Sequence, residues 1–447
     1  MKTPIFDFVK GYENAHVTRF HMPGHKGKSF LGCEPLDVTE IMGADVLYSP
    51  DGIIAESENN ASALFGTAHS FYSAEGSSLS IKAMLALVTI DRTAEERPLI
   101  VAARNAHKAF VYACALLDLD VQWLYPVKGS PLCSCVLTPE DVKNALTGSK
   151  IKPSAVYLTS PDYLGQVCDI EGIAGVCHQY GIPLLVDNAH GAYLKFLTPS
   201  GHPMDLGADL CCDSAHKTLP VLTGGAYLHI STNTDPSYLQ NARKMLSVFA
   251  STSPSYLILQ SLDLCNAYLE DGYSKKLQTC VEKINTVKQK AAALGLSVVD
   301  SEALKMVLNA NASGYTGEEL ADFLRKYRIE AEFADLSHLV LMITPENTDD
   351  DLWRLTNALE VLPQKDPLFF EIPSVFPHRM CEKSIREAIF APQESVPFEK
   401  SLGRICATPT VSCPPAIPIV MSGERITKED VELLRCYGIN TIAVVKE

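Results

Sequence analysis

Between about residue 76 and residue 230, short apolar runs alternate with segments of helical periodicity, and this alternation constrains the fold most strongly. The apolar runs lack polar alternation, so strands formed from them need cover on both faces. We therefore predict an α/β domain, a mostly parallel sheet with helices on both faces. The predicted strands are Leu99–Ala103, Ala155–Thr159, Pro183–Asp187, Ala208–Cys212 and Ala226–Ile230, and the helices are Ser78–Ile90, Ala106–Leu117, Pro139–Leu146 and Ile170–Tyr180.

The pattern changes after this region, where a long helical stretch with a polar face runs over Tyr238–Leu294. Short strands and helices follow and predict a smaller α+β C-terminal domain. The predicted strands are Ser297–Asp300, Met306–Asn309, Leu339–Ile343 and Ala416–Val420, and the helices are Thr316–Tyr327, Asp349–Leu362 and Thr427–Cys436. Thr316 and Glu319 have the spacing of a capping box. The Pro-rich passage Pro363–Pro377 is the predicted linker.

Composition narrows the class of protein and of partner. The chain has 447 residues, of which 47% are hydrophobic and 20% charged, as in soluble globular proteins. No run reaches the ~18 apolar residues that a membrane span needs. The 38 basic and 53 acidic residues give a net charge of −15, which disfavours nucleic acid and anionic membranes as partners and suits a cationic substrate.

The 14 cysteines do not indicate a secreted chain, because no apolar signal core precedes the first acidic residue. We expect a cytoplasmic protein with reduced, mostly buried thiols. No C-x-x-C pair offers zinc ligands. His21 and His25 have the spacing of helical metal ligands, but Pro23 and Gly24 between them disfavour a helix, so we predict no metal.

Two apolar strands are followed by groups that could carry chemistry. The first ends on Asp187, with His190 in the next turn, and the second leads into Ser214, His216 and Lys217. Because ligands of open sheets bind at the carboxyl ends of strands, these groups are expected at one edge. A lysine and a carboxylate there suit pyridoxal 5'-phosphate (PLP): the lysine forms a Schiff base and the carboxylate keeps the ring nitrogen protonated.

A third element could hold a phosphate. Gly76 permits a tight turn, and Ser77 and Ser78 stand at the start of a predicted helix, where free N–H groups favour anions. Each element also has an ordinary explanation: serine is a common N-cap, an Asp at a strand end often caps a helix or forms a turn, and a lone lysine is usually solvated.

Over nearly its whole length the sequence resembles the Orn/Lys/Arg decarboxylases, PLP enzymes of the aspartate-aminotransferase fold type. The matching segments occur in the same order along the chain. They are Phe20-His-Met-Pro-Gly-His-Lys26, Leu64-Phe-Gly66, Arg104-Asn-Ala-His-Lys108, Val186-Asp-Asn-Ala-His-Gly191, Ser214-Ala-His-Lys217, Ser251-Thr-Ser-Pro-Ser-Tyr256 and Pro414-Pro-Ala-Ile-Pro418.

The resemblance implies an N-terminal arm over residues 1–50, a PLP-binding large domain over 51–290 and a C-terminal α+β region over 291–447. It implies that Lys217 is the Schiff-base lysine, Asp187 the partner of the ring nitrogen and His107 the imidazole stacked on the ring. It also implies a homodimer with composite sites. The implied phosphate ligands are Ser77, Ser78, Ser214 and His216, with Thr252 or Ser253 from the partner subunit.

The sequence departs from the usual family pattern at four positions. The family usually has Asn at Glu75, Thr at Asp162, Glu at Asn188 and Gly at Ala416. The receiver-like wing of the long, acid-induced members is also absent, so the chain resembles the short group. Residues that hold the cofactor are kept while their neighbours vary, which makes the cofactor a firmer inference than the substrate.

The implied activity is decarboxylation of a basic L-amino acid, arginine first and then lysine or ornithine. His190 is expected to tune the cofactor, or else to be a buried structural histidine, and His216 or Lys217 to donate the proton that replaces CO2. A PLP aminotransferase or lyase remains an alternative, because the same lysine and aspartate serve those reactions. A non-catalytic paralogue is a second alternative, suggested by Glu75 and Asn188.

Overall fold

The structure is a computed structural model, and it describes residues 1–90, 97–369, 381–409 and 417–446. The chain forms two compact units, which we describe separately. Unit 1 comprises residues 1–96, 153–160 and 170–275, and unit 2 comprises residues 97–152, 161–169 and 276–447. The predicted domain limits at residues 50 and 290 stay a prediction.

Unit 1 is built on β1 (His69–Ser73), β4 (Ala155–Thr159), β5 (Leu184–Asp187), β6 (Leu210–Asp213) and β7 (Ala226–Ile230). β4, β5 and β6 are parallel neighbours, whereas β7 pairs antiparallel with both β6 and β1. The connection from β6 to β7 holds only the single-turn helix α7 (Ala215–Thr218), too little for the crossover that a parallel pair needs. The strands predicted in this unit are therefore present, but β7 runs antiparallel to its neighbours β6 and β1.

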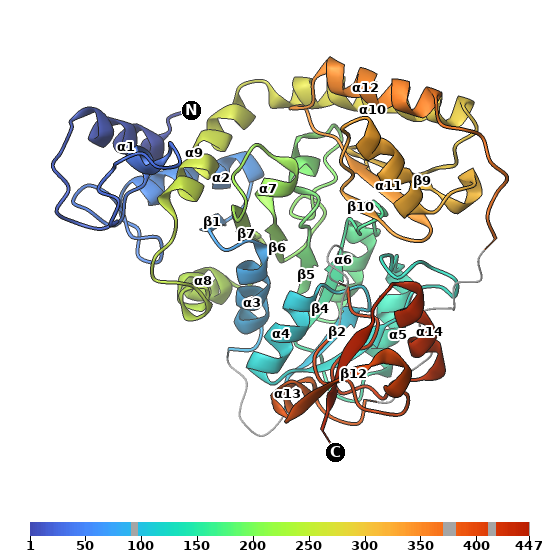
Figure 1. The fold of residues 1–447 in the computed structure, drawn as a ribbon. Coiled ribbons are helices and arrows are strands. Elements are labelled where there is room, and N and C mark those ends of the chain that lie inside the picture. The colour runs from blue at the N-terminus through green and yellow to red at the C-terminus, as the bar shows by residue number, and fades with distance from the viewer. Residues whose placement is uncertain (91–96, 370–380, 410–416, 447) are drawn as a thin grey trace. The chain divides into compact units, whose positions relative to one another are not determined.

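Helices cover this sheet (Figure 1). α3 (Ser77–Leu87) packs against β1, β5, β6 and β7 and is in turn contacted by α8 (Pro236–Phe249), and α6 (Ile170–Gln179) packs against β5. α1 (Pro4–Asn14), α2 (Ile53–Phe65) and α9 (Tyr256–Glu270) pack against one another, and α2 also packs against β1. The short 3-10 segments of this unit are η1 (Glu34–Leu36) and η2 (Ala192–Phe196).

The long helical stretch predicted over Tyr238–Leu294 is divided into three helices, namely α8, α9 and α10 (Tyr273–Ala293). The first break falls at residues 250–255, where Pro254 lacks a backbone N–H. The second falls at Gly272, whose φ of +69° is in the left-handed region that glycine adopts most easily.

Unit 2 contains the parallel pair β2 (Leu99–Ala103) and β3 (Asp120–Leu124), with α4 (Lys108–Leu117) and α5 (Pro139–Gly148). Its second sheet is antiparallel, in the order β10-β11-β9-β8. Its third is the antiparallel hairpin of β12 and β13. The remaining elements are β8 (Val298–Val299), β9 (Lys305–Asn309), η3 (Asn311–Ser313), α11 (Gly317–Lys326), β10 (Phe333–Ala334), β11 (His338–Met342), α12 (Asp349–Glu360), α13 (Ile385–Phe390), β12 (Gln393–Pro397), η4 (Phe398–Lys400), α14 (Lys428–Cys436) and β13 (Thr441–Val445).

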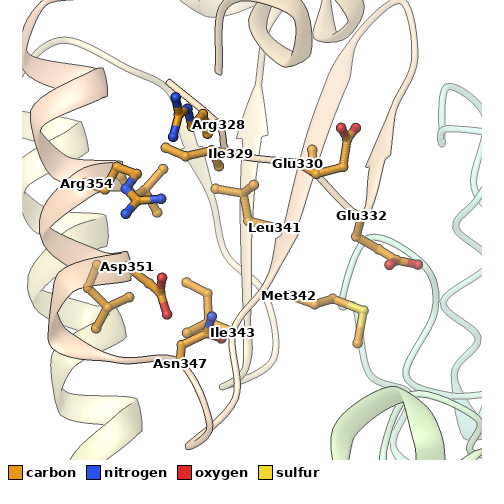
Figure 2. A pocket seen from close by; sticks show the side chains of 13 residues that line it. Arg328, Ile329, Glu330, Glu332, Leu341, Met342, Ile343, Asn347, Asp351 and Arg354 are labelled. Atoms are coloured by element: carbon orange, nitrogen blue, oxygen red, sulfur yellow. The ribbon is translucent and has the colours of Figure 1, made fainter. Parts of the chain in front are cut away.

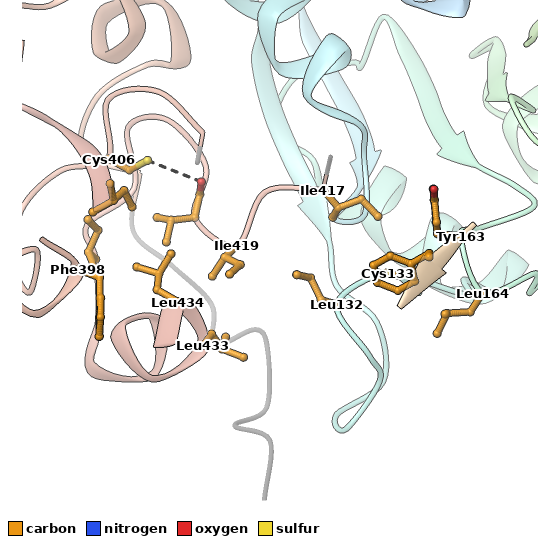
Figure 3. Close-up of a cluster of buried hydrophobic side chains, with 14 of the residues drawn as sticks. Leu132, Cys133, Tyr163, Leu164, Phe398, Cys406, Ile417, Ile419, Leu433 and Leu434 are labelled. Carbon is orange, nitrogen blue, oxygen red and sulfur yellow. Dashed lines mark hydrogen bonds between the residues drawn. The ribbon is translucent and has the colours of Figure 1, made fainter. Parts of the chain in front are cut away.

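The capping box at the start of α11 is confirmed, with Thr316 accepting from the Glu319 backbone and Glu319 from the Thr316 backbone. The strand predicted over Ala416–Val420 is wrong for residues 417–420, and Ala416 lies outside the described residues. Instead, Ile417, Ile419 and Val420 enter a buried apolar cluster with Leu433 and Leu434 of α14. Figure 3 shows this cluster, in which the Cys406 thiol lies 3.7 Å from a backbone carbonyl of the same segment. The apolar side chains of this segment predicted a strand, but they are buried without strand pairing.

Of the cysteines that the structure describes, all are free thiols, and only Cys381 is exposed. This confirms reduced, mostly buried thiols in those parts of the chain. The predicted linker Pro363–Pro377 lies outside the described residues from 370 onward. Among the helices described, none has both the length and the apolarity to cross a membrane.

Candidate active site

The site begins with a lysine and a histidine at the ends of two neighbouring parallel strands. Lys217 lies on α7, directly after β6, and His190 lies in the turn after β5. The Lys217 Nζ is 3.1 Å from the His190 Nε2. The His190 side chain is buried, whereas Lys217 is only partly buried. The two strand ends thus bring an amine and an imidazole into contact, at the sheet edge where the sequence predicts both residues.

Asp187 is the last residue of β5 and is 2% exposed. Its carboxylate accepts hydrogen bonds from the Tyr157 hydroxyl at 3.1 Å and from the Ala189 backbone N–H at 3.2 Å. Burial raises the pKa of Asp187, and the positive charge of Lys217 and these hydrogen bonds offset part of that rise. A buried carboxylate of this kind is stabilised in its charged form by a protonated partner nearby.

The N-terminus of α3 lacks a side-chain cap. Its N-cap residue is Gly76, with φ +71°, which has no side chain that could accept a hydrogen bond from the first turn. The explanation of a serine N-cap is therefore wrong, because Ser77 is already the first helical residue. The Ser214 hydroxyl donates to the Ser77 hydroxyl at 2.8 Å, and Ser78 follows in the same turn. Free N–H groups and two neighbouring hydroxyls form a suitable site for an anion.

His216 also lies on α7, beside Lys217. Its Nδ1 is 3.0 Å from the Gly225 carbonyl oxygen, which can only accept, so the proton lies on Nδ1. Burial lowers the pKa of His216, against the effect of this hydrogen bond. In the neutral form of His216, the unprotonated ring nitrogen is therefore Nε2.

Thr252 and Ser253 lie in the exposed loop between α8 and α9, and their hydroxyls make no hydrogen bond among the described residues. The Ser251 backbone N–H donates to the Glu75 carboxylate at 2.7 Å. Glu75, one of the departures from the family pattern, therefore attaches this loop beside Gly76 within one chain.

His107 belongs to unit 2, where it is the N-cap of α4 and its Nδ1 accepts from the Ala109 backbone at 3.1 Å. Asp162 is also in unit 2, buried, and accepts hydrogen bonds at 2.9 Å from the backbones of Leu164 and Gln166. Its backbone carbonyl accepts from the buried Lys305 ammonium at 2.8 Å. Local hydrogen bonds thus satisfy Oδ1 of this departure from the family pattern, whereas burial of the carboxyl raises the pKa of Asp162.

Sequence reasoning missed a buried network around Asp213. The Asn188 amide donates to Asp213 Oδ1 at 2.7 Å, and the Nε2 atoms of His202 and His229 lie 3.0 and 3.1 Å from Oδ2. Burial alone would raise the pKa of Asp213, but the two histidines outweigh burial and lower it. A charged residue ending an apolar strand, directly before Ser214, is the signal in the sequence that could have revealed this network.

His202, Cys211 and Asp213 lie close enough together to hold a metal ion. However, the His202 Nδ1 accepts a hydrogen bond from the Met204 backbone, so its Nε2 carries the proton and donates to Asp213. The group is therefore explained by hydrogen bonds. His21 and His25 do not share a helix: His21 contacts the Tyr12 hydroxyl at 2.7 Å, and His25 contacts Asp37 at 3.1 Å.

Comparison with known proteins identifies relatives over almost the whole chain. The family model for the major domain of Orn/Lys/Arg decarboxylases matches residues 3–310, and that for their C-terminal domain matches residues 371–438. The uncharacterized protein YaaO of Bacillus subtilis (strain 168) is 32% identical over 97% of this chain and 94% of its own. The arginine decarboxylase of the same organism is 28% identical over 97% of this chain and 93% of its own.

Solved structures show the same fold. The lysine decarboxylase LdcF of Francisella novicida has a TM-score of 0.79 at 16% identity, covering 99% of this chain and 81% of that chain. The constitutive lysine decarboxylase of Escherichia coli has a TM-score of 0.76 at 16% identity, covering 100% and 82%. These likenesses confirm the predicted α/β sheet domain with a smaller α+β region. With the two family matches, they establish that the chain belongs to the Orn/Lys/Arg decarboxylase family and is a decarboxylase.

Proposed function

We propose that this protein is a PLP-dependent decarboxylase of a basic L-amino acid, arginine first and then lysine or ornithine, releasing the amine and CO2. The observation that carries the proposal is the buried Asp187 carboxylate beside the Lys217–His190 contact, at neighbouring strand ends. The names of the relatives, arginine decarboxylases in sequence and lysine decarboxylases in structure, support the substrate class.

The residues present fit the cofactor. Lys217 offers an amine for covalent attachment, and Asp187 offers a buried carboxylate for the ring nitrogen. The uncapped N-terminus of α3, with the hydroxyls of Ser77 and Ser214, suits the phosphate. When bound, PLP supplies an electron sink for the pair left on the substrate as CO2 departs. Ser78, His216, His107, Thr252 and Ser253 are further proposed contacts.

The protein groups have separable tasks. The Tyr157 hydroxyl and the Ala189 N–H orient the Asp187 carboxylate, so that it can hold a proton on the ring nitrogen. The His216 proton is held on Nδ1 by a backbone carbonyl, which leaves Lys217 as the better source of the proton that replaces CO2. His190, in contact with the Lys217 amine, orients that amine and receives or returns its proton.

Release of CO2 from a panel of L-amino acids tests the activity and the substrate class. Arginine, lysine and ornithine should react, whereas citrulline and norleucine should lose roughly 10⁴-fold in kcat/KM, because their neutral ends leave buried polar groups unpaired. Lys217→Ala should abolish release, and Lys244→Ala, which removes an exposed lysine of α8, should not. Equal values for charged and neutral substrates would contradict the substrate class and leave the cofactor proposal standing.

Attachment of the cofactor is tested independently of turnover. Borohydride reduction of the PLP-loaded protein, followed by peptide mapping, should place the label on Lys217 in the wild type and in Lys244→Ala. A label on another lysine would contradict the assignment. Absence of any visible absorbance band after incubation with PLP would instead favour a non-catalytic member of the family.

A further inference from the structure

Two features of the structure lie outside the proposed cofactor contacts. The first is a pocket of about 450 Å³ in unit 2, between β11, α12 and the segment 328–332 that follows α11 (Figure 2). Guanidinium and carboxylate groups balance one another in its lining, which includes Arg328, Arg354, Glu330, Glu332 and Asp351. The second is the buried network around Asp213 in unit 1, which reaches the turn that carries His190.

The contact between Lys217 and His190 joins two short segments of the chain. Lys217 lies on α7, a helix of four residues, and His190 lies in the turn that follows β5. A backbone hydrogen bond from the Gly191 N–H to the Asn188 carbonyl, at 2.8 Å, closes this turn. Because neither segment is long, their 3.1 Å contact depends on the side chains that hold the two segments relative to each other.

Asp213 connects these two segments. It is the last residue of β6, immediately before Ser214 and α7, and its Oδ1 accepts a hydrogen bond from the Asn188 amide at 2.7 Å. Both side chains belong to fully buried residues, with 0% of their surface exposed. The hydrogen bond is therefore shielded from water, and it attaches the turn after β5 to the end of β6.

The other oxygen of Asp213 fixes the orientation of the carboxylate. Oδ2 lies 3.0 Å from the His202 Nε2 and 3.1 Å from the His229 Nε2. The Met204 backbone N–H donates to the His202 Nδ1, and the Ser70 hydroxyl lies 2.8 Å from the His229 Nδ1. Each histidine can thus present an Nε2 proton to the carboxylate. Although burial opposes it, both histidines lower the pKa of Asp213, which is therefore ionised.

The ionised carboxylate decides how the Asn188 amide points. A carboxylate only accepts hydrogen bonds, so the amide turns its amino group towards Asp213 and its oxygen away. On the other side, a Cβ atom at position 191 would lie 1.9 Å from the Asn188 Oδ1, and Gly191 leaves the space for that oxygen. Asn188 follows Asp187 and stands two residues before His190, so holding Asn188 holds the turn that carries both.

We propose that Asp213 is a positioning residue for the decarboxylation proposed above, on which this inference rests. Its hydrogen bond to Asn188 keeps His190 within reach of the Lys217 amine, so Asp213 acts through Asn188 and not by contact with the substrate. The acidic group that the family usually has at position 188 is placed here on the neighbouring strand, and the turn has an amide that this carboxylate holds. Loss of the bond should let the turn move and separate the imidazole from the amine.

Labelling of the Lys217 amine tests this role without any cofactor. The full-length protein is treated with trinitrobenzenesulfonate over a series of pH values, and peptide mapping gives the pH at which labelling of Lys217 is half-maximal. An imidazole that accepts from the ammonium favours its charged, unreactive form. Asn188→Ala should therefore move this pH down by about half a unit or more. Asp213→Asn should move it in the same direction, because a neutral amide no longer dictates how Asn188 points.

The matched control is Ser70→Ala, because Ser70 is also 0% exposed and also contacts the network, through His229. It lies on β1, which β7 and β6 separate from β5, so its loss should lower the melting temperature and leave labelling of Lys217 unchanged. Asn188→Ala leaves Asp213 its two histidine partners, so this variant should fold. An equal shift in Asn188→Ala and Ser70→Ala, or no shift in Asn188→Ala or in Asp213→Asn, would overturn the role of Asp213.

Steady-state kinetics of the PLP-loaded variants gives a second measurement. Asn188→Ala should lower kcat about tenfold or more and leave KM within about twofold, because a group at the reacting amine is displaced while the substrate contacts stay. Ser70→Ala should keep the wild-type kcat, and a wild-type kcat in Asn188→Ala would also overturn the role. A wild-type protein that releases no CO2 would contradict the proposed function alone, because the labelling shift decides the positioning role independently.

Discussion

The Asp187 carboxylate is buried and bonded to Tyr157, and its proposed task is to keep a ring nitrogen protonated. Asp187→Asn preserves the shape but removes the charge. Losing a charge-assisted hydrogen bond of ~1.5–3 kcal/mol in the transition state predicts about one to two decades of lost kcat. Steady-state CO2 release measures this, with Asp271→Asn, an exposed site in the same unit, as the control. Near-wild-type turnover in Asp187→Asn would remove this role from Asp187.

Asn188, one of the departures from the family pattern, is explained by its hydrogen-bond partner Asp213. Its amide donates to the buried, ionised Asp213, which also accepts from His202 and His229. A second carboxylate at this position would have to be protonated or repel Asp213.

Asn188→Asp should therefore lower the free energy of unfolding by ~1.5–3 kcal/mol near neutral pH, because a charge-assisted hydrogen bond is lost. The new carboxyl would have a raised pKa in the folded state. The loss should consequently be smallest below its unfolded pKa of ~3.9 and increase as pH rises. Urea unfolding across pH measures both effects. Asn233→Asp, at an exposed position, should change little, and equal effects of the two variants would contradict the network.

At the level of elements, helix α1 is held to unit 1 by one carboxylate of α9. Asp263 accepts from the backbone N–H groups of Ile5 and Phe6, each at 2.9 Å, and from the Ser57 hydroxyl at 2.5 Å. Burial raises the pKa of Asp263 to about 6, against the opposing effect of these bonds. The N-terminal helix is thus attached through a carboxyl group whose pKa in the folded protein, about 6, lies above its value in the unfolded chain.

A raised carboxyl pKa means that the folded state binds the proton more tightly, so stability is higher below the unfolded pKa and is lost as pH rises towards 6. Between pH 4 and 6 this decline should be of the order of 1–3 kcal/mol. Asp263→Asn should remove that slope, which urea unfolding at several pH values measures. An unchanged slope would show that other groups cause it. Asp271→Asn, at the exposed end of the same helix, is the matched control.

For the whole molecule we predict a homodimer with composite active sites. The hydroxyls of Thr252 and Ser253 lie on an exposed loop and make no hydrogen bond in the part of the chain that the structure describes. In the family a similar segment completes the phosphate site of the neighbouring subunit. Mixing Lys217→Ala with a Thr252→Ala/Ser253→Ala variant should therefore restore activity, since a hybrid dimer pairs one intact lysine with one intact loop.

The matched control for this experiment mixes Lys217→Ala with Asp187→Asn. Lys217 and Asp187 lie in the same unit of one chain, so no hybrid dimer can combine both intact residues in one site. This mixture should therefore show no more activity than Asp187→Asn alone. If the loop variant also shows no recovery, although subunits are demonstrably exchanged, each site is built from one chain.

The sequence by itself determined the features that depend on neighbouring residues. The strands β2, β4 and β7 have the predicted limits, because continuous apolar runs require burial on both faces. The capping box at Thr316 was predicted because its partners are three residues apart. The sequence placed Lys217 and His190 at one edge of the sheet because both follow strands that end there, and the structure adds their contact.

Only the tertiary structure decided the features that depend on residues far apart in the chain. Tyr157 binds Asp187 across two strands, and Asn188 meets Asp213 from another strand. Segment 417–420 is buried without forming a strand, because apolar composition specifies burial but not hydrogen-bonded pairing. The pocket around Arg328 and Arg354 arises because the turn after α11 and the helix α12 meet over β11, a juxtaposition that no local pattern in the sequence encodes.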